Sequence, residues 1–85
     1  MSYRIDFTAS AAREFERLTH AVRDRVSRKI AVLRENPFPA GILKLSSGYE
    51  GHRLRVGDWR ILYTVEASDQ VITVYAVRHR REAYR

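Results

Sequence analysis

Cysteine is absent from this chain. Disulfide bonds and metal sites with thiolate ligands are therefore excluded, and the composition fits a reducing compartment. Apolar runs are short, and none approaches the ~20 residues that a membrane-spanning helix requires. The first residues, Met1 to Asp6, lack the apolar segment of a signal peptide. We therefore expect a soluble, cytoplasmic protein that does not enter a membrane.

Patterns that bind metals or cofactors are missing as well. The histidines, His20, His52 and His79, show no ligand spacing, and no paired carboxylates accompany them. The glycines are scattered rather than gathered into a phosphate-binding loop. The serine pair at 46–47 belongs to no nucleophile motif. We therefore expect no metal site and no cofactor.

Positive charge, by contrast, is abundant. Lys and Arg number 16 against 10 Asp and Glu, which gives a formal net charge of +6. Only Lys29 and Lys44 are lysines, so the excess consists almost entirely of arginine. The planar guanidinium pairs bidentately with phosphate or carboxylate. This balance indicates a nucleic acid, an anionic membrane or an acidic protein as the partner.

Hydrophobic periodicity predicts a single α+β domain over residues 1–85, a length that suffices for one core. The predicted strands cover residues 3–8, 52–56, 59–66 and 71–78, and the predicted helices cover 9–18 and 20–35. Thr8 and Thr19 are the expected helix caps. The short link between the helices predicts an antiparallel helical hairpin. The last three strands predict an antiparallel meander, so we expect a four-stranded sheet with the helices on one face.

The segment 37–51 is interpreted as a loop, and the dipeptide Gly57-Asp58 as a two-residue hairpin turn of type II′. This turn sets Val56 opposite Trp59 and Arg55 opposite Arg60. Side chains alternate between the two faces of a sheet. One face then holds the apolar side chains that the helices can cover: Leu54, Val56, Trp59, Ile61, Tyr63 and Val65. The other face holds Arg53, Arg55 and Arg60.

Two like charges directly opposite each other destabilise a sheet by roughly 0.2–1 kcal/mol. The Arg55–Arg60 pair is understandable if an anion lies between the two guanidiniums. Alternatively, both side chains extend into water or pair with an acid such as Glu50 or Glu66. The pattern alone does not decide between these interpretations.

A turn at Ser68-Asp69 predicts that Glu66 pairs with Val71 and Thr64 with Thr73. Without a bulge, Leu62 then meets Tyr75 and Arg60 meets Val77. This register would bring the tail residues His79, Arg80, Arg81 and Tyr84 to the arginine face.

Two of these tail residues carry chemistry that arginine lacks. The imidazole of His79 suits proton transfer near neutral pH, although a lone histidine in a tail is more often simply exposed. The ring of Tyr84 could stack on a base or pack on the domain. His52, on the apolar side, is interpreted as structural.

The segment 52–63, which reads H-R-L-R-V-G-D-W-R-I-L-Y, and the ending 77–84, V-R-H-R-R-E-A-Y, resemble the RelE/ParE toxin superfamily. The likeness is to the RelE branch in particular, and it covers nearly the whole chain. It implies a toxin of a type II toxin–antitoxin pair whose partners are a RelB-type antitoxin and the ribosome with its mRNA. The implied activity is ribosome-dependent, metal-free cleavage of mRNA in the A site, by attack of the 2′-hydroxyl.

The resemblance also implies roles for single residues. Arg53 and Arg55 match basic substrate-binding positions, and Arg60 matches a phosphate-binding arginine. Arg80 matches an arginine that acts as an acid or stabilises charge, and Tyr84 matches a tyrosine that stacks on the substrate. His79 stands where other members carry a basic residue. Arg81 is added as a substrate-binding candidate because the expected tail brings it to the same face.

Positions 53 and 55 are often lysine in the family, and this is a departure with chemical consequences. Arginine stays protonated and is a poor general base. His79 and Tyr84 are therefore the better candidates for proton transfer, and the base remains open. Two other functions also remain open: inhibition of DNA gyrase through protein contacts, as in the ParE branch, and non-catalytic binding of RNA or the ribosome.

Overall fold

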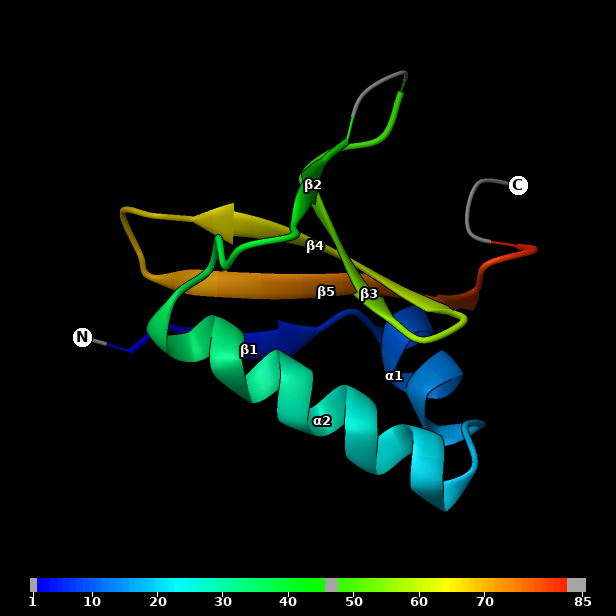
Figure 1. The fold of residues 1–85 in the computed structure, drawn as a ribbon. Helices are drawn as coiled ribbons and strands as arrows, with labels where there is room; N and C mark the ends of the chain where they lie inside the picture. Colours follow the sequence, from blue (N-terminus) through cyan, green and yellow to red (C-terminus); the bar gives the residue numbers. More distant parts are fainter. Residues whose placement is uncertain (1, 46–47, 83–85) are drawn as a thin grey trace.

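The computed structural model describes residues 2–45 and 48–82. Two helices lie on one face of a mixed five-stranded sheet with the strand order β1-β5-β4-β3-β2 (Figure 1). The elements are β1 (Arg4–Phe7), α1 (Ala9–Glu16), α2 (His20–Glu35), β2 (Leu43–Lys44), β3 (His52–Val56), β4 (Trp59–Glu66) and β5 (Val71–His79). The predicted α+β class, with helices covering one face, is confirmed.

The expected count of four strands is wrong, because β2 adds a fifth. It lies inside the segment interpreted as a loop and pairs antiparallel with β3, Leu43 opposite Arg53 and Lys44 opposite His52. A strand of two residues is too short to produce a readable alternation. At the other edge, β1 pairs in parallel with β5, which makes the sheet mixed.

Both predicted helix caps are present. The Thr8 hydroxyl oxygen accepts a hydrogen bond from the backbone N–H of Ala11 at 3.2 Å, and that of Thr19 accepts one from Val22 at 3.3 Å. Each bond satisfies a backbone donor that the first helical turn would otherwise leave unpaired. None of the helices in the described ranges is long and apolar enough to cross a membrane.

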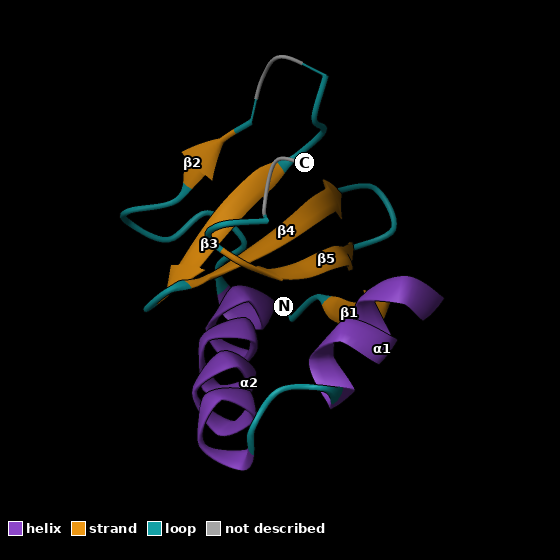
Figure 2. Ribbon diagram, turned by 90° about the vertical axis from the view of Figure 1, so that its right-hand side faces the viewer, coloured by secondary structure: helices purple, strands orange, loops and turns teal. Residues whose placement is uncertain are grey.

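The helices run in opposite directions, as expected of a hairpin, but they diverge from their short link (Figure 2). A groove of about 460 Å³ opens between them over β1. Its walls are mainly apolar and include Ile5, Phe7, Phe15 and Ile30. The helix pair is therefore held together chiefly through the sheet beneath it.

The main core lies between the helices and the sheet. Leu54, Val56, Ile61 and Tyr63 are buried there, and Trp59 and Val65 pack against them, as the alternation predicts. The opposite face carries a second, smaller core of Leu45, Leu62 and Ala76, flanked by Tyr49 and Tyr75. The connection between β2 and β3 thus contributes apolar cover to part of the face that holds the predicted arginines.

The predicted pairing of β4 with β5 is correct near the turn and wrong beyond it. Glu66 pairs with Val71 and Thr64 with Thr73, but the register shifts between Leu62 and Tyr63. Leu62 therefore pairs with Ala76, and Arg60 with Arg78. One extra residue in a strand reverses which face every later side chain occupies. The end of β5 is consequently turned over relative to the expectation.

Candidate functional site

Three arginines lie abreast across the sheet. Arg55 of β3 is opposite Arg60 of β4, as predicted, and Arg60 is opposite Arg78 of β5. Their sequence neighbours Leu54, Ile61 and Val77 belong to the helix-side core, so alternation directs the Cβ atoms of all three to the other face. The Arg78 side chain ends beside Glu14 of α1, at the edge of β5. We call Arg55, Arg60 and Arg78 the arginine row.

The β3–β4 turn fixes two members of this row. The Gly57 carbonyl oxygen accepts hydrogen bonds from Arg60 Nη1 at 2.9 Å and from Arg55 Nε at 3.4 Å. Arg60 Nη1 also donates to the carbonyl of Trp59 at 3.1 Å. Gly57 has a φ of +59°, and Asp58 is not among the described residues with positive φ, which is the pattern of the predicted type II′ turn. The turn therefore holds two guanidiniums beside each other on an open edge of the molecule.

Glu66 does not serve as the counter-charge that was considered for this pair. It lies at the far end of β4, six residues from Arg60, which corresponds to roughly 20 Å along a strand. Its carboxylate instead accepts a hydrogen bond from Ser68 at 3.1 Å.

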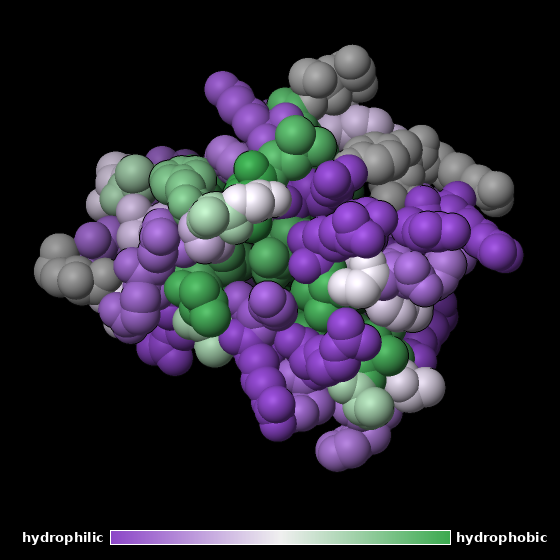
Figure 3. All heavy atoms as spheres, in the orientation of Figure 1, coloured by the Kyte–Doolittle hydropathy of each residue, from purple (hydrophilic) through white to green (hydrophobic). Residues whose placement is uncertain are grey.

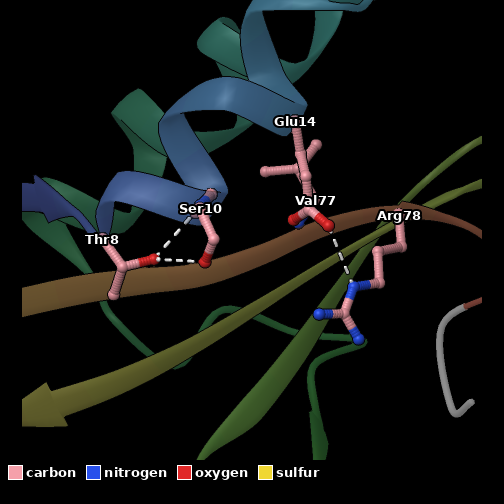
Figure 4. Close-up of polar contacts among 6 residues, drawn as sticks. Thr8, Ser10, Glu14, Val77 and Arg78 are labelled. Carbon is pink, nitrogen blue, oxygen red and sulfur yellow. Dashed lines mark hydrogen bonds and ion pairs between the residues drawn. The ribbon is translucent and has the colours of Figure 1, made fainter.

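The third arginine of the row is paired with a carboxylate from α1. Arg78 Nε lies 3.1 Å from Glu14 Oε2, and the other oxygen of Glu14 accepts a hydrogen bond from the backbone N–H of Val77 at 2.9 Å (Figure 4). Strand β1 covers β5 only as far as Val74, so Glu14 satisfies a backbone donor on the edge beyond it. The row thus has one paired end, at Arg78, and one exposed end, at Arg55.

His79 lies on the face opposite to the one expected. It pairs with Trp59 across the sheet, and the two rings meet edge to face with centroids 5.4 Å apart. Trp59 packs on the main core, so His79 is on the helix side of the sheet. The prediction that His79 joins the arginine face is wrong, because the bulge in β5 exchanges the faces that the side chains beyond Tyr75 occupy.

The remaining predicted residues lie at different places. Arg53 is half-buried opposite Leu62, beside the second core. Arg80 is exposed, and its backbone N–H donates to the Asp58 carbonyl at 2.7 Å, which keeps it next to the β3–β4 turn. Arg81 is also exposed, and its N–H donates to His79 Nδ1 at 3.4 Å. Tyr84 falls outside the described residues.

His52 has surroundings that suit the structural role predicted for it. Its ring stacks on Tyr63 at 5.7 Å and meets the edge of Phe38 at 4.9 Å. Burial, with a further contribution from the charge of Lys44, lowers the pKa of His52. Burial also raises the pKa of Tyr63 to about 12, and the Tyr63 hydroxyl donates to the Pro37 carbonyl at 2.7 Å. This aromatic cluster anchors the segment after α2 to the sheet.

Sequence reasoning missed a second basic feature, a groove of about 530 Å³ between α2 and the β3–β4 turn. We call it the basic groove; its lining residues are Arg25, Arg28, Lys29, Arg55, Val56 and Gly57. Figure 3 shows hydrophilic side chains on both sides of a narrow hydrophobic strip in this part of the molecule. The spacing of positions 25, 28 and 29 indicates one helix face. The position of this helix face opposite Arg55 depends on tertiary packing, so the sequence did not predict the groove.

The arrangement suits the binding of a polyanion. Guanidiniums on a sheet and on a helix can bind phosphate oxygens and stabilise negative charge, but they do not remove protons at neutral pH. Within the described ranges, no three His, Asp or Glu side chains gather as metal ligands would.

Comparison with solved structures identifies the fold. The chain is 27% identical to RelE in the RelE–RelB complex from the archaeon Pyrococcus horikoshii OT3, with 98% of this chain and 100% of that one covered and a TM-score of 0.83. The E. coli RelBE toxin–antitoxin complex matches at 24% identity, 92% and 96% coverage and a TM-score of 0.81. A YoeB/ParE toxin from Agrobacterium tumefaciens matches at 20% identity, with 89% of this chain and 96% of that one covered and a TM-score of 0.79. The last two similarities concern the fold alone.

No curated protein sequence matches the chain. A family model does: residues 5–84 match the ParE toxin of the type II toxin–antitoxin system parDE. The resemblance to the RelE/ParE superfamily is thereby confirmed over nearly the whole sequence. The chain belongs to the ParE toxin family of type II toxin–antitoxin systems.

Proposed function

We propose that this toxin is a ribosome-dependent endoribonuclease that cleaves mRNA in the A site. The observation that carries the proposal is the pair Arg55 and Arg60, two like charges that the Gly57 carbonyl holds together on an exposed face. Like charges directly opposite each other in a sheet cost roughly 0.2–1 kcal/mol, and a phosphate bound between them would offset that cost. The phosphate of an RNA strand is an anion of suitable size and charge.

The proposed reaction uses a nucleophile from the substrate itself. The 2′-oxygen forms a bond to the adjacent phosphorus, and the bond from phosphorus to the 5′-oxygen breaks. One proton leaves the 2′-hydroxyl and one reaches the departing 5′-oxygen, which gives a 2′,3′-cyclic phosphate and a 5′-hydroxyl. The protein must therefore position the strand, stabilise charge on the phosphate and transfer protons.

The chain offers a residue for each of these tasks. Arg53, Arg55 and Arg81 would hold substrate phosphates, while Arg60 and Arg80 would stabilise the charge that develops at the reacting phosphate. Because His79 packs against Trp59 on the helix side, we assign proton transfer to Tyr84 in preference to His79. Tyr84 would also stack on a substrate base, as the resemblance implies.

The dependence on the ribosome follows from the same set of residues. Arginines supply charge but no base, and Arg55, at one end of the arginine row, is exposed. Exact placement of the 2′-oxygen in line with the leaving oxygen can contribute much of the rate enhancement, and the ribosome would provide it.

We further propose a RelB-type antitoxin as the protein partner. The RelE toxins from P. horikoshii and E. coli were solved in complexes with their antitoxins. A net charge of +6 favours an acidic partner that covers the arginine row.

Gyrase inhibition is the rival function, and the description of the matching family as ParE keeps it in view. Primer extension on mRNA under translation with the purified chain distinguishes the two. Breaks within the A-site codon, with cyclic phosphate and 5′-hydroxyl ends, would support the nuclease. Loss of gyrase supercoiling without any mRNA cleavage, or cleavage that leaves 5′-phosphate ends, would refute it.

A further inference from the structure

The basic groove concentrates positive charge from two elements. Arg25, Arg28 and Lys29 are exposed on α2, and exposed Arg55 faces them from β3. Among the described residues, none of those that line the groove is acidic. The approach is close at the turn, because a Cβ atom at Gly57 would lie 3.0 Å from Arg25 Nη2.

Ion pairs between described residues balance only part of this charge. Arg28 forms an ion pair with Asp24 at 2.8 Å, one helical turn away. In the described ranges, no ion pair accompanies Arg25, Lys29 or Arg55. Three uncompensated cations around one cavity repel each other, and an anion within the cavity would relieve that repulsion.

The basic groove is continuous with the arginine row through Arg55. This residue lines the groove and also stands opposite Arg60 in the sheet. An extended polyanion bound at the row could therefore pass the β3–β4 turn and reach α2 without leaving positively charged surface.

We propose that the basic groove binds backbone phosphates of an RNA strand and extends the contact made at the arginine row. The inference rests on the proposed function in one respect, that RNA is the class of substrate. It adds Arg25, Arg28 and Lys29 of α2 as binding residues, and none of these three is assigned to cleavage. The RNA could be the message or a strand of the ribosome, since both present the same phosphates.

The composition of the groove favours RNA over an acidic protein segment. Protein interfaces bury an apolar centre, whereas phosphate contacts need cations and hydrogen-bond donors. Of the described residues that line the groove, Val56 is the only large apolar one, and it is itself buried. The broader apolar surface lies elsewhere, between α1 and α2 over β1.

The test measures binding to RNA that cannot be cleaved. Fluorescence anisotropy would follow the full chain with a labelled 2′-O-methyl oligonucleotide, which lacks the attacking hydroxyl. The variant Arg25→Gln with Lys29→Gln removes two charges from the groove. Its matched control, Arg13→Gln with Arg34→Gln, removes two exposed charges from outside it.

We expect the groove variant to bind roughly tenfold more weakly at ~0.1 M salt, and the control less than twofold more weakly. The slope of log K against log salt should fall by about 1.4 in magnitude for the groove variant, since each lost phosphate contact with a single strand contributes about 0.7. Circular dichroism melts would establish that both variants fold. Binding of a single-stranded oligonucleotide is compared with binding of a hairpin. Tighter binding of the single strand indicates that the groove takes the message, and tighter binding of the hairpin indicates that it takes a folded RNA of the ribosome.

Equal losses in the two double variants would overturn the proposal, because net charge alone would then explain binding. It would also be overturned if a glutamate-rich peptide of equal charge bound as tightly, with the same dependence on Arg25 and Lys29. The oligonucleotide cannot report cleavage, so the two proposals fail separately. A chain that cleaves in the A site but binds RNA without help from Arg25 and Lys29 would refute only the groove.

Discussion

At the scale of single residues, the site depends on how a few polar atoms are oriented. The Gly57 carbonyl accepts from two guanidiniums, and the Glu14 carboxylate accepts from a backbone N–H and a third guanidinium. These contacts fix the two ends of the arginine row differently. Arg60 is held rigidly between them by the strand and the turn, which is the property required of a group that stabilises a transition state.

Arg60→Ala should therefore lower the single-turnover rate of A-site cleavage by about 10²–10³, the usual cost of one preorganised charge donor. Binding to the ribosome should change little, because under the proposed function other arginines would also contribute to it. Arg13→Ala, an exposed arginine on α1, serves as the control and should leave the rate unchanged. A loss of ribosome affinity that accounts for the whole effect would show that Arg60 acts in binding alone.

The proton-transfer role is tested by His79→Gln and by two changes at Tyr84. With His79 packed against Trp59, we expect His79→Gln to lower the cleavage rate by less than ~10-fold, whereas losing a general base typically costs ~10²–10⁴. Tyr84→Phe should cost ~10² or more if its hydroxyl transfers a proton. If Tyr84→Phe is nearly silent and only Tyr84→Ala is damaging, the ring acts by stacking. A large effect at His79 would return the role to the imidazole.

A glycine provides a stability prediction with its own control. A Cβ atom at Gly51 would lie 2.0 Å from the Tyr63 carbonyl oxygen, and the residue has a φ of +87°. Gly51→Ala should lower the free energy of unfolding by about 2–4 kcal/mol, through backbone strain and the forced displacement of β4. Gly41 has a φ of +88°, but a Cβ atom there would meet no other atom within 4 Å. Gly41→Ala should cost only ~1–2 kcal/mol. Urea titration of both variants would measure the two losses, and equal losses would contradict the clash at Gly51.

At the scale of elements, local signals predicted much of the fold. Thr8 and Thr19 marked both helix starts, and the two-residue turn at Gly57-Asp58 fixed the register of β3 with β4. The cross-strand pair Arg55–Arg60 could therefore be placed from the sequence. Features that arise from tertiary packing could not be placed. No periodicity in the sequence indicates the two-residue strand β2, the divergence of the helices or the alignment of α2 with Arg55. The bulge at Tyr75 is not marked by a glycine, so it could not be predicted either.

Glu14 joins α1 to β5 through a backbone hydrogen bond and an ion pair, and two substitutions at this position should separate the contributions of these contacts to stability. Glu14→Ala leaves the Val77 N–H and Arg78 without their partner, so we expect unfolding to become easier by about 1–3 kcal/mol. The amide oxygen of Glu14→Gln can still accept a hydrogen bond from the Val77 N–H, but the negative charge that pairs with Arg78 is lost. This variant should therefore lose clearly less stability than Glu14→Ala. Thermal melts of both variants would measure this. Identical losses would show that the ion pair, rather than the backbone contact, holds α1 to β5.

At the scale of the whole molecule, apolar and basic surfaces are segregated. The apolar groove lies between the helices over β1, whereas the arginine row and the basic groove meet at the β3–β4 turn. A net charge of +6 adds a long-range attraction for any acidic partner. Salt screens this attraction between exposed charges, with a Debye length of ~10 Å at 0.1 M.

Affinity for the cognate antitoxin should therefore fall as salt rises, mainly through slower association. The variant Arg55→Ala with Arg60→Ala should bind more weakly and show a shallower salt dependence, as measured by surface plasmon resonance between ~0.05 and ~0.5 M salt. The same pair of changes at Arg13 and Arg34 provides the comparison. An affinity that responds neither to salt nor to Arg55 and Arg60 would mean that the antitoxin is held by apolar contacts.

The bulge at Tyr75 has a consequence for how toxins of this family are aligned. Simple alternation from the β4–β5 turn would place His79 on the same face as the arginines. Its pairing with Trp59 places it on the face of the main core. A relative with the same number of residues in this strand but no bulge would present the odd-numbered tail positions where this chain presents the even-numbered ones. A bulge that is gained or lost without a matching insertion or deletion therefore reverses the faces of the residues beyond it, and two members with identical tail motifs can direct them to opposite sides of the sheet.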